Sequence, residues 1–451
     1  MTGIKEFIMK NPDGKYYKKL TEELARLNSE LNAFNNINFS VSSGYPLSVK
    51  DNICVKGVET TASSGVLKGY KPPFNATAVE RLLGKGFGFI GKTNMDEFGF
   101  GSFGLNSANP SRNPFDKERV AGGSSSGAAI AASIIENHIA LAESTGGSIA
   151  APASFCGVVG LTPTYGVVSR YGLIDYGNSL DKIGLIGRRA QDIKYAFDII
   201  RGSDRYDATC IDMPKGSETQ NPIRKLIVLE NLLEHVEENV RDSFENTISK
   251  LSGLGFEIEN KKAEELESSI AVYYIIAMAE ASTNLAKYTG FKYGNSLGDF
   301  SKDYNEFFTE ARDKFGEEAK RRIVLGTYIR SASVRERYYY KALQIRRRIG
   351  QRLSGMAKDG GIILPTMPML PPKLSEAKEL SPLQSYMVDM LTVPANLTGL
   401  PHISFPTDYK NGLPVGTQVI GAPYEEYRLL DLAETWEKGF RYRFAYNLGS
   451  L

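Results

Sequence analysis

The sequence contains only three cysteines, three histidines and one tryptophan in 451 residues. Cys54, Cys156 and Cys210 lie far apart and form no C-x-x-C pair, which argues against a zinc ribbon and favours a reducing compartment. Apolar runs of roughly 18 residues, which a membrane-spanning helix needs, are absent from it. Its N-terminal segment also lacks the apolar stretch of a secretory signal. We therefore expect a cytoplasmic protein with no membrane association.

Neither sign of charge is in large excess. The 54 Lys and Arg residues nearly balance the 52 Asp and Glu residues, and the net charge is +2. A nucleic-acid-binding protein usually has a larger and more clustered basic excess. One basic cluster does lie between Lys320 and Arg348, and its ordinary interpretation is a solvated face of a long helix.

Helix-period and strand-like segments alternate through most of the chain. The strand-like runs are residues 87–90, 138–142, 225–230, 362–365, 402–406 and 417–422. This alternation predicts an α/β fold in which helices pack against a mainly parallel or mixed sheet. Residues 263–356 are almost free of such runs, so we expect a helix-rich layer there. Because no internal repeat is visible, we treat residues 1–451 as a single domain.

The segment from Gly86 to Thr93 matches G-x-x-x-x-G-K-[ST], the pattern of a phosphate-binding P-loop. A P-loop needs a strand before its first glycine and a helix that begins at the Lys-Thr pair. Here a helical segment precedes Gly86, and the supposed loop is itself apolar and strand-like. A P-loop nucleotide-binding protein therefore stays only as an alternative from another class, which loss of nucleotide binding in Lys92→Ala would support.

Two Gly-Gly-Ser units, at residues 122–124 and 146–148, lie 24 residues apart with a helix-like and a strand-like segment between them. Glycine pairs let the main chain approach a ligand and point successive N–H groups at one spot, which suits an oxyanion or a phosphate. A nearby serine is then placed to attack. The alternative is a pair of flexible linkers, but linkers do not flank buried alanine-rich helices.

A serine nucleophile needs a proton acceptor. His138, His235 and His402 lie in neither glycine-rich nor acidic segments, so the sequence does not favour a Ser-His-Asp triad. Lys50 is the other candidate because it ends an apolar strand-like run, and burial can keep a lysine neutral. The alternative role for Lys50 is a structural ion pair with Asp51.

The sequence resembles the amidase signature family, whose members hydrolyse amides through a Ser-Ser-Lys relay. The resemblance rests on SVKDN at 48–52, GGSSSG at 122–127 and TGGSIAAPASFCGVVGLTPTYG at 145–166. Within that family, other segments are similar to the A subunits of glutamyl-tRNA(Gln)/aspartyl-tRNA(Asn) amidotransferases. These segments are residues 92–98, 169–184, 279–294, 320–328 and 391–401. The resemblance implies a central, mixed and twisted sheet with helices on both faces.

The resemblance also implies a role for each residue of the relay. Ser148 would be the nucleophile, and Ser124, after a cis peptide bond, would pass the proton between Ser148 and Lys50. An oxyanion hole would be formed by main-chain N–H groups, those of Thr145, Gly146, Gly147 and Ser148. We therefore expect covalent catalysis by an acyl-enzyme, with no metal or cofactor in this chain.

By the same resemblance, the substrate is glutamine, held by Tyr273, Arg322 and Asp389. Arg322 would bind the α-carboxylate, since a planar guanidinium pairs bidentately with a carboxylate. Asp389 would bind the α-amino group. The ammonia released would pass to a B subunit that uses ATP and magnesium to amidate misacylated tRNA, with a C subunit bridging the two. This assignment removes Arg322 from the solvated helix face.

Two positions depart from the family's usual Asp-Thr-Gly-Gly-Ser-Ile-Arg, because Ser144 and Ala150 replace its acidic and basic residues. Both members of a plausible ion pair are missing together, so no buried charge is left without a partner. We expect a loop that is held differently but stays active; the alternative is a non-catalytic scaffold subunit. Within the same fold, the alternative is a stand-alone amidase for small amides, which would not need Arg322 and Asp389.

Overall fold

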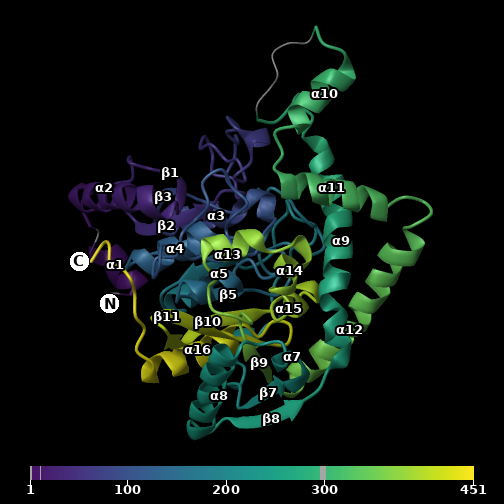
Figure 1. Cartoon of the computed structure of the whole chain (residues 1–451). Helices are drawn as coiled ribbons and strands as arrows, with labels where there is room; N and C mark the ends of the chain where they lie inside the picture. Colours follow the sequence, from purple (N-terminus) through teal and green to yellow (C-terminus); the bar gives the residue numbers. More distant parts are fainter. Residues whose placement is uncertain (1–2, 11, 295–300, 451) are drawn as a thin grey trace.

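The computed structural model describes residues 3–10, 12–294 and 301–450. Its centre is one 11-stranded sheet with the order β1-β3-β2-β4-β6-β5-β10-β11-β9-β7-β8 (Figure 1). The strands are β1 (Phe34–Ile37), β2 (Tyr45–Lys50), β3 (Phe87–Thr93), β4 (Ile139–Ser144), β5 (Val159–Thr162), β6 (Lys182–Gly187), β7 (Lys225–Leu229), β8 (Glu257–Lys261), β9 (Gly361–Pro365), β10 (His402–Lys410) and β11 (Leu413–Ile420). Strand β2 is parallel to β3 and β4, and β7 is parallel to β8 and β9, whereas the remaining pairs are antiparallel. The predicted mixed sheet is confirmed.

Helices cover both faces of the sheet (Figure 1). One face packs against α1 (Ile4–Lys10), α3 (Thr77–Leu83), α6 (Ala190–Ile200), α8 (Glu238–Gly253) and α16 (Glu426–Gly439). The other face packs against α2 (Gly14–Leu31), α4 (Ser126–Ile134), α5 (Ala150–Phe155), α9 (Ser269–Asn284), α12 (Lys341–Asp359) and α15 (Val393–Leu397). Strand β4 shows the cause: Ile139 and Leu141 belong to the first core and Ala140 and Ala142 to the second, because successive side chains point to opposite faces.

The helix-rich layer lies where the sequence predicts it. Residues 263–294 and 301–356, the described part of that segment, contain no strand. Helices α9, α11 (Glu317–Ile329) and α12 stand together beside the sheet, and α10 (Tyr304–Arg312) extends away from it (Figure 1). The basic cluster is not one long helix, because a turn and a short π-helix, Glu336–Tyr340, separate α11 from α12. Arg322 on α11 is buried, so the solvated-face interpretation is wrong for it.

The P-loop alternative is contradicted by strand β3. Residues Phe87–Thr93 form a fully buried strand between β1 and β2, so their N–H groups face neighbouring strands rather than a phosphate. The amine of Lys92 donates to the main-chain oxygen of Ile53 and lies 3.9 Å from Oδ1 of Asp51. Asp51 therefore pairs with Lys92, and the alternative of a structural Lys50–Asp51 pair is also wrong.

Smaller helices complete the fold, and the two ends of the chain lie near each other (Figure 1). These helices include α7 (Glu230–Leu233), α13 (Leu374–Glu379) and α14 (Pro382–Met387). The hydroxyl of Tyr16 donates to the main-chain oxygen of Gly449 at 3.3 Å, so the first long helix contacts the C-terminal segment. All three cysteines are buried free thiols. Within the described ranges, no helix has the length and apolar character needed to cross a membrane.

Candidate active site

The candidate site lies where three neighbouring parallel strands end. Lys50 is the last residue of β2 and pairs with Thr93 at the end of β3. On the other side of β2, Val49 pairs with Leu141 of β4, so the end of β4 reaches the same edge of the sheet. The carboxyl ends of parallel strands are the usual place for a ligand site in an α/β sheet. Both Gly-Gly-Ser units adjoin this edge, one before α4 and one between β4 and α5.

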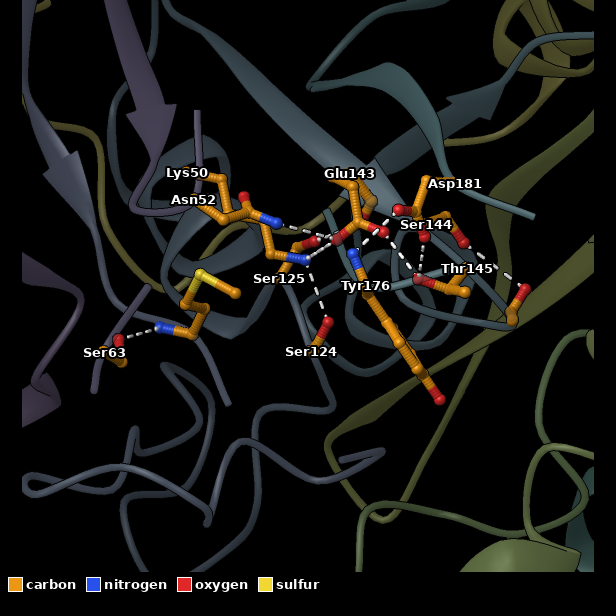
Figure 2. A network of polar contacts seen from close by, with 12 residues as sticks. Lys50, Asn52, Ser63, Ser124, Ser125, Glu143, Ser144, Thr145, Tyr176 and Asp181 are labelled. Carbon is orange, nitrogen blue, oxygen red and sulfur yellow. Dashed lines mark hydrogen bonds and ion pairs between the residues drawn. The ribbon is translucent and has the colours of Figure 1, made fainter. Parts of the chain in front are cut away.

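Lys50 has no exposed surface and is held by three hydrogen bonds. Its Nζ atom donates to Oγ of Ser124, to the main-chain oxygen of Glu143 and to Oε2 of Glu143, each at 2.9 Å (Figure 2). Burial lowers the pKa of Lys50, while the Glu143 carboxylate opposes that shift. The structure thus brings two of the predicted relay residues, Lys50 and Ser124, into direct contact.

The two serine-bearing segments lie against each other. The Gly123–Ser124 peptide bond is cis, as the resemblance implied. The N–H of Ser125 donates to the main-chain oxygen of Ser148 at 3.2 Å, which joins the segments. Ser148 keeps 6% of its surface exposed. Among the described residues, no hydrogen bond joins the hydroxyls of Ser124 and Ser148, so the structure places the predicted nucleophile beside the pair without completing the relay.

The loop at residues 145–148 presents unpaired main-chain donors. Within the described part of the chain, the N–H groups of Gly146, Gly147 and Ser148 donate to no protein acceptor. A Cβ atom on Gly146 would lie 3.0 Å from the hydroxyl of Tyr273, and one on Gly147 would collide with Oγ1 of Thr392. Only glycine allows this approach at residue 147. Free N–H groups beside a serine can stabilise an oxyanion.

Three polar side chains hold this loop, and the sequence analysis missed all of them. Oε1 of Glu143 lies 2.7 Å from Oγ1 of Thr145, which also lies 3.0 Å from Oδ1 of Asp181. Asn396 donates to the main-chain oxygens of Thr145 and Leu180. A glutamate in the otherwise apolar IALAES run was the available signal for Glu143. Nothing in the sequence pointed to Asp181 or Asn396.

Ser144, which stands where the family usually has aspartate, forms a hydrogen bond within the loop. The hydroxyl of Ser144 donates to the main-chain oxygen of Gly146 at 3.3 Å, and Ala150 is fully buried at the start of α5. The loop is therefore fastened by Glu143, Asp181 and Asn396, together with this short serine contact. The hypothesis that such a loop stays active remains a prediction.

Arg322 lies on a cavity of about 360 Å³, lined also by Asp96, Ser102 and Tyr386. Its Nε donates to Oε1 of Glu318 at 2.8 Å, and its Nη1 donates to the hydroxyl of Tyr176. That hydroxyl lies 3.4 Å from the hydroxyl of Tyr273, which packs on Gly146. Tyr273 thus packs directly on the oxyanion loop, and Arg322 is connected to it through Tyr176 and Tyr273.

Asp389 brings an unpaired acidic oxygen to the same region. Its Oδ2 accepts hydrogen bonds from Ser102 at 2.6 Å and from Tyr274 at 3.4 Å. Its Oδ1 is buried with no hydrogen-bond partner among the described residues, and lies 3.3 Å from where a Cβ on Gly147 would be. Burial raises the pKa of Asp389 to about 6. A buried acid and a buried arginine in the same region match the two charges of a free amino acid.

The histidines take no part in this arrangement. His138 is buried at the start of β4 with Nε2 2.9 Å from Oγ of Ser48, and burial lowers its pKa to about 3. His402 is buried on β10, where burial lowers its pKa well below the usual value. Neither histidine contacts Ser124 or Ser148 within the part of the chain described. Among the described residues, no cluster of three or more His, Cys, Asp or Glu side chains could hold a metal ion.

Comparisons with known proteins agree with this geometry. A sequence profile described as Amidase matches residues 19–430. The A subunit of glutamyl-tRNA(Gln) amidotransferase from Thermotoga maritima is 41% identical over 436 residues, which cover 93% of this chain and 91% of that protein. The protein of the same name from Sulfolobus acidocaldarius is 43% identical over 422 residues, covering 90% of this chain and 86% of that protein.

Solved structures show the same relationship. The crystal structure of the Thermotoga maritima protein superposes with a TM-score of 0.80 at 37% identity, over 96% of this chain and 94% of that one. A crystal structure described as an amidase gives a TM-score of 0.73 at 28% identity, over 93% and 88% of the two chains. With its Lys50–Ser124 pair at the ends of parallel strands and a profile match over most of its length, the chain belongs to the amidase family.

Proposed function

We propose that this chain is the glutamine-hydrolysing A subunit of a tRNA-dependent amidotransferase. It releases ammonia for the conversion of Glu-tRNA(Gln) or Asp-tRNA(Asn) to the amidated form. With Glu-tRNA(Gln), this is the reaction of a glutamine-hydrolysing glutaminyl-tRNA synthase. One observation carries the proposal: the unpaired oxygen of Asp389 lies beside Gly147, and buried Arg322 contacts Tyr176, whose hydroxyl lies near that of Tyr273 on Gly146. The relatives that are named as A subunits of glutamyl-tRNA(Gln) amidotransferase support it.

Substrate orientation follows from these charges. Arg322 binds the α-carboxylate of glutamine, Asp389 binds its α-ammonium group, and Tyr273 lies against Gly146 with its hydroxyl near that of Tyr176. The side-chain amide then extends toward Ser148. A small neutral amide would leave Nη2 of Arg322 and Oδ1 of Asp389 without partners among the described residues, and leaving buried polar atoms unpaired disfavours such a substrate.

The reaction proceeds through an acyl-enzyme. Oγ of Ser148 attacks the amide carbon while its proton moves to Ser124, whose own proton moves to the neutral amine of Lys50. The N–H groups of residues 146–148 stabilise the negative charge on the amide oxygen. As the C–N bond breaks, the proton returns through Ser124 to the leaving nitrogen, and ammonia departs. Water then attacks the glutamyl ester by the same relay and releases glutamate.

The burial of Lys50 favours the neutral form of its amine, which can accept a proton. A lysine in water is protonated at neutral pH, with a pKa of about 10.4, whereas a buried lysine loses the hydration that stabilises its charge. Lys50 has no exposed surface and reaches Ser124 at 2.9 Å, so a neutral amine is placed to accept the serine proton.

The ammonia is consumed outside this chain. We assign the ATP and magnesium chemistry to a partner B subunit, with a C subunit bridging the two, and misacylated tRNA reaches the complex in the cytoplasm. We assign no cofactor to this chain, and the continuity of its 11-stranded sheet supports a single domain.

Ammonia release from glutamine tests this proposal. The wild-type chain, with and without its partners, is compared with Ser148→Ala and with Ser133→Ala. Ser133 is a matched control because it is buried on α4 and its hydroxyl lacks a hydrogen-bond partner among the described residues. We expect loss of activity in Ser148→Ala only. Wild-type activity in Ser148→Ala would overturn the nucleophile, and hydrolysis of small amides but not of glutamine would instead identify a stand-alone amidase.

A further inference from the structure

Glu143 is a buried acid at the centre of the site to which the proposed mechanism gives no role. It lies near the end of β4 with 1% of its surface exposed. Its Oε2 accepts hydrogen bonds from Lys50 at 2.9 Å and from Nδ2 of Asn52 at 3.1 Å (Figure 2). Its Oε1 lies 2.7 Å from the hydroxyl of Thr145, the first residue of the oxyanion loop. Each carboxylate oxygen thus contacts a different part of the site.

The single hydroxyl of Thr145 contacts two buried acids, Glu143 and Asp181. It lies 2.7 Å from Glu143 and 3.0 Å from Asp181, but a hydroxyl has one proton to donate. One of the two carboxyl groups must therefore be protonated for both contacts to be hydrogen bonds. Burial, reinforced by the nearby Glu143 charge, raises the pKa of Asp181 well above its usual value. This shift favours the proton on Asp181, so that the Thr145 hydroxyl donates to Glu143, whose Oε2 accepts from Lys50.

Three carboxyl groups lie near the Lys50 amine. The side chain faces Glu143 from β4, Asp96 from the segment after β3, and Asp181 from the segment before β6. Asp96 accepts N–H groups from Gly104 and Asn106, and burial raises its pKa to about 6. Glu143 is the acid in direct contact with the Lys50 amine.

We propose that Glu143 is a positioning residue that holds Lys50 against Ser124, links it to the oxyanion loop and sets the pH range in which Lys50 acts as a base. The inference rests on the proposed amide-hydrolysing mechanism. When Lys50 accepts a proton from Ser124, the resulting ammonium faces the Glu143 carboxylate, so the charge formed during acylation has a partner 2.9 Å away.

This arrangement balances two opposing effects. Burial alone makes the amine a weak base, whereas a close anion favours the ammonium form. General-base catalysis is most efficient when the pKa of the base lies near the working pH. Glu143 therefore raises the pKa of Lys50 against the lowering effect of burial.

The experiment compares Glu143→Gln with Glu143→Asp. Glutamine keeps the shape and an acceptor oxygen but removes the charge, so the acid limb of kcat/KM against pH should move down by about one unit or more. Aspartate keeps the charge on a shorter side chain, so kcat should fall while the acid limb stays within about half a unit of wild type. An equal displacement of the limb in both variants would overturn the inference, because charge would not be the cause.

A matched control is Glu426→Gln. Glu426 is also fully buried and faces a buried lysine, Lys182, but it lies on α16 and bonds the N–H of Thr164 at 2.6 Å. The acid limb should not move in this variant. If it moves as far as in Glu143→Gln, any buried negative charge produces the effect and the specific role of Glu143 is lost.

A second readout separates this inference from the proposed function. A small sulfonyl fluoride modifies an activated serine: the Ser148 oxygen bonds to sulfur, fluoride leaves, and the serine proton passes to Ser124 and Lys50. Its rate against pH needs neither glutamine nor partner subunits. The proposed function alone would be refuted if the acid limb of the modification rate shifts in Glu143→Gln while the wild-type protein releases no ammonia from glutamine. An unshifted limb in active Glu143→Gln would refute this inference alone.

Discussion

Nε of Arg322 donates a hydrogen bond to Oε1 of Glu318 at 2.8 Å, so the guanidinium is already held by one acid before any substrate binds. Nη1 is taken by Tyr176, and Nη2 has no protein partner among the described residues. The Nη2 atom is therefore available for the carboxylate that the proposed binding of glutamine requires. Glu318 also accepts the hydroxyl of Tyr386 at 2.8 Å, which fixes the acid in turn.

We predict that Arg322→Lys raises KM for glutamine by about tenfold or more and changes kcat little, because lysine keeps the charge but lacks the planar fork. Steady-state ammonia release measures both constants. Lys320→Gln, a half-exposed position on the same helix, serves as the control and should leave KM unchanged. An unaltered KM in Arg322→Lys would favour a substrate without a carboxylate.

Asp389→Asn should weaken the binding of glutamine and increase the free energy of unfolding. The folded-state pKa of Asp389, about 6, lies above its ordinary value of 3.8. The folded protein therefore binds this proton more tightly than the unfolded chain, and stability falls as pH rises from about 4 to about 6. The isosteric amide removes that loss, which is on the order of 3 kcal/mol above pH 7.

Urea unfolding of wild type and Asp389→Asn at pH 4 and pH 7.5 tests this relationship. The stability advantage of the variant should be present at pH 7.5 and disappear at pH 4. Its KM for glutamine should be higher at pH 7.5, whereas the wild-type KM should rise as pH falls through about 6. A variant that is less stable than wild type at pH 7.5 contradicts the raised pKa.

Lys92→Ala should destabilise the fold without removing a nucleotide site. Lys92 is buried on β3 and faces the buried Asp51, and an acid left without its partner costs about 3–5 kcal/mol. Lys85→Ala, at the exposed end of the preceding turn, is the control and should change the free energy of unfolding little. Titration of the wild-type chain with Mg-ATP should show no binding; tight binding would restore the P-loop interpretation.

Ammonium added from outside should bypass the relay. With the B and C subunits, ATP and misacylated tRNA present, a complex that contains Ser148→Ala should fail with glutamine and succeed with ammonium chloride. Lys50→Met should behave in the same way, because both variants remove only the source of ammonia. Failure of the Ser148→Ala complex with ammonium would show that this serine also supports the second half-reaction.

Restoring the family's charged pair should bring no gain. In Ser144→Asp with Ala150→Arg, the new arginine enters a fully buried position at the start of α5. The loop is already fastened by Glu143 and Asn396. We expect glutaminase activity no higher than wild type in the same ammonia assay, and a hundredfold increase would show that the natural loop is impaired.

Much of this architecture could be predicted from the sequence. The alternation of apolar runs located β3, β4, β7, β9, β10 and β11, because their side chains are buried on both faces. It did not reveal β1, β5, β6 or β8; β8 has the polar sequence EIENK and lies at the edge of the sheet. It also gave no sign that the basic stretch divides into α11 and α12, since charged residues continue across the break.

The candidate site shows the same limit. Lys50 and the two Gly-Gly-Ser units can be recognised in the local sequence. A lysine at the end of an apolar run and a pair of glycines before a serine are both patterns that indicate a site. The contacts of Glu143 with Lys50, of Thr145 with Asp181, and of Gly147 with Thr392 join residues from different elements. Such pairings depend on how the strands end and where the loops return, so local pattern alone does not contain them.

The two outermost strands protect the sheet from growing. β1 has the sequence FNNI and β8 has EIENK, both short and polar. Lys261 on β8 forms ion pairs with Glu259 and Asp359, so charge surrounds this open margin. A strand from another molecule that docked there would have to strip water from these groups, which disfavours edge-to-edge pairing. A wide β-sheet can thus persist in a concentrated protein solution without templating aggregates.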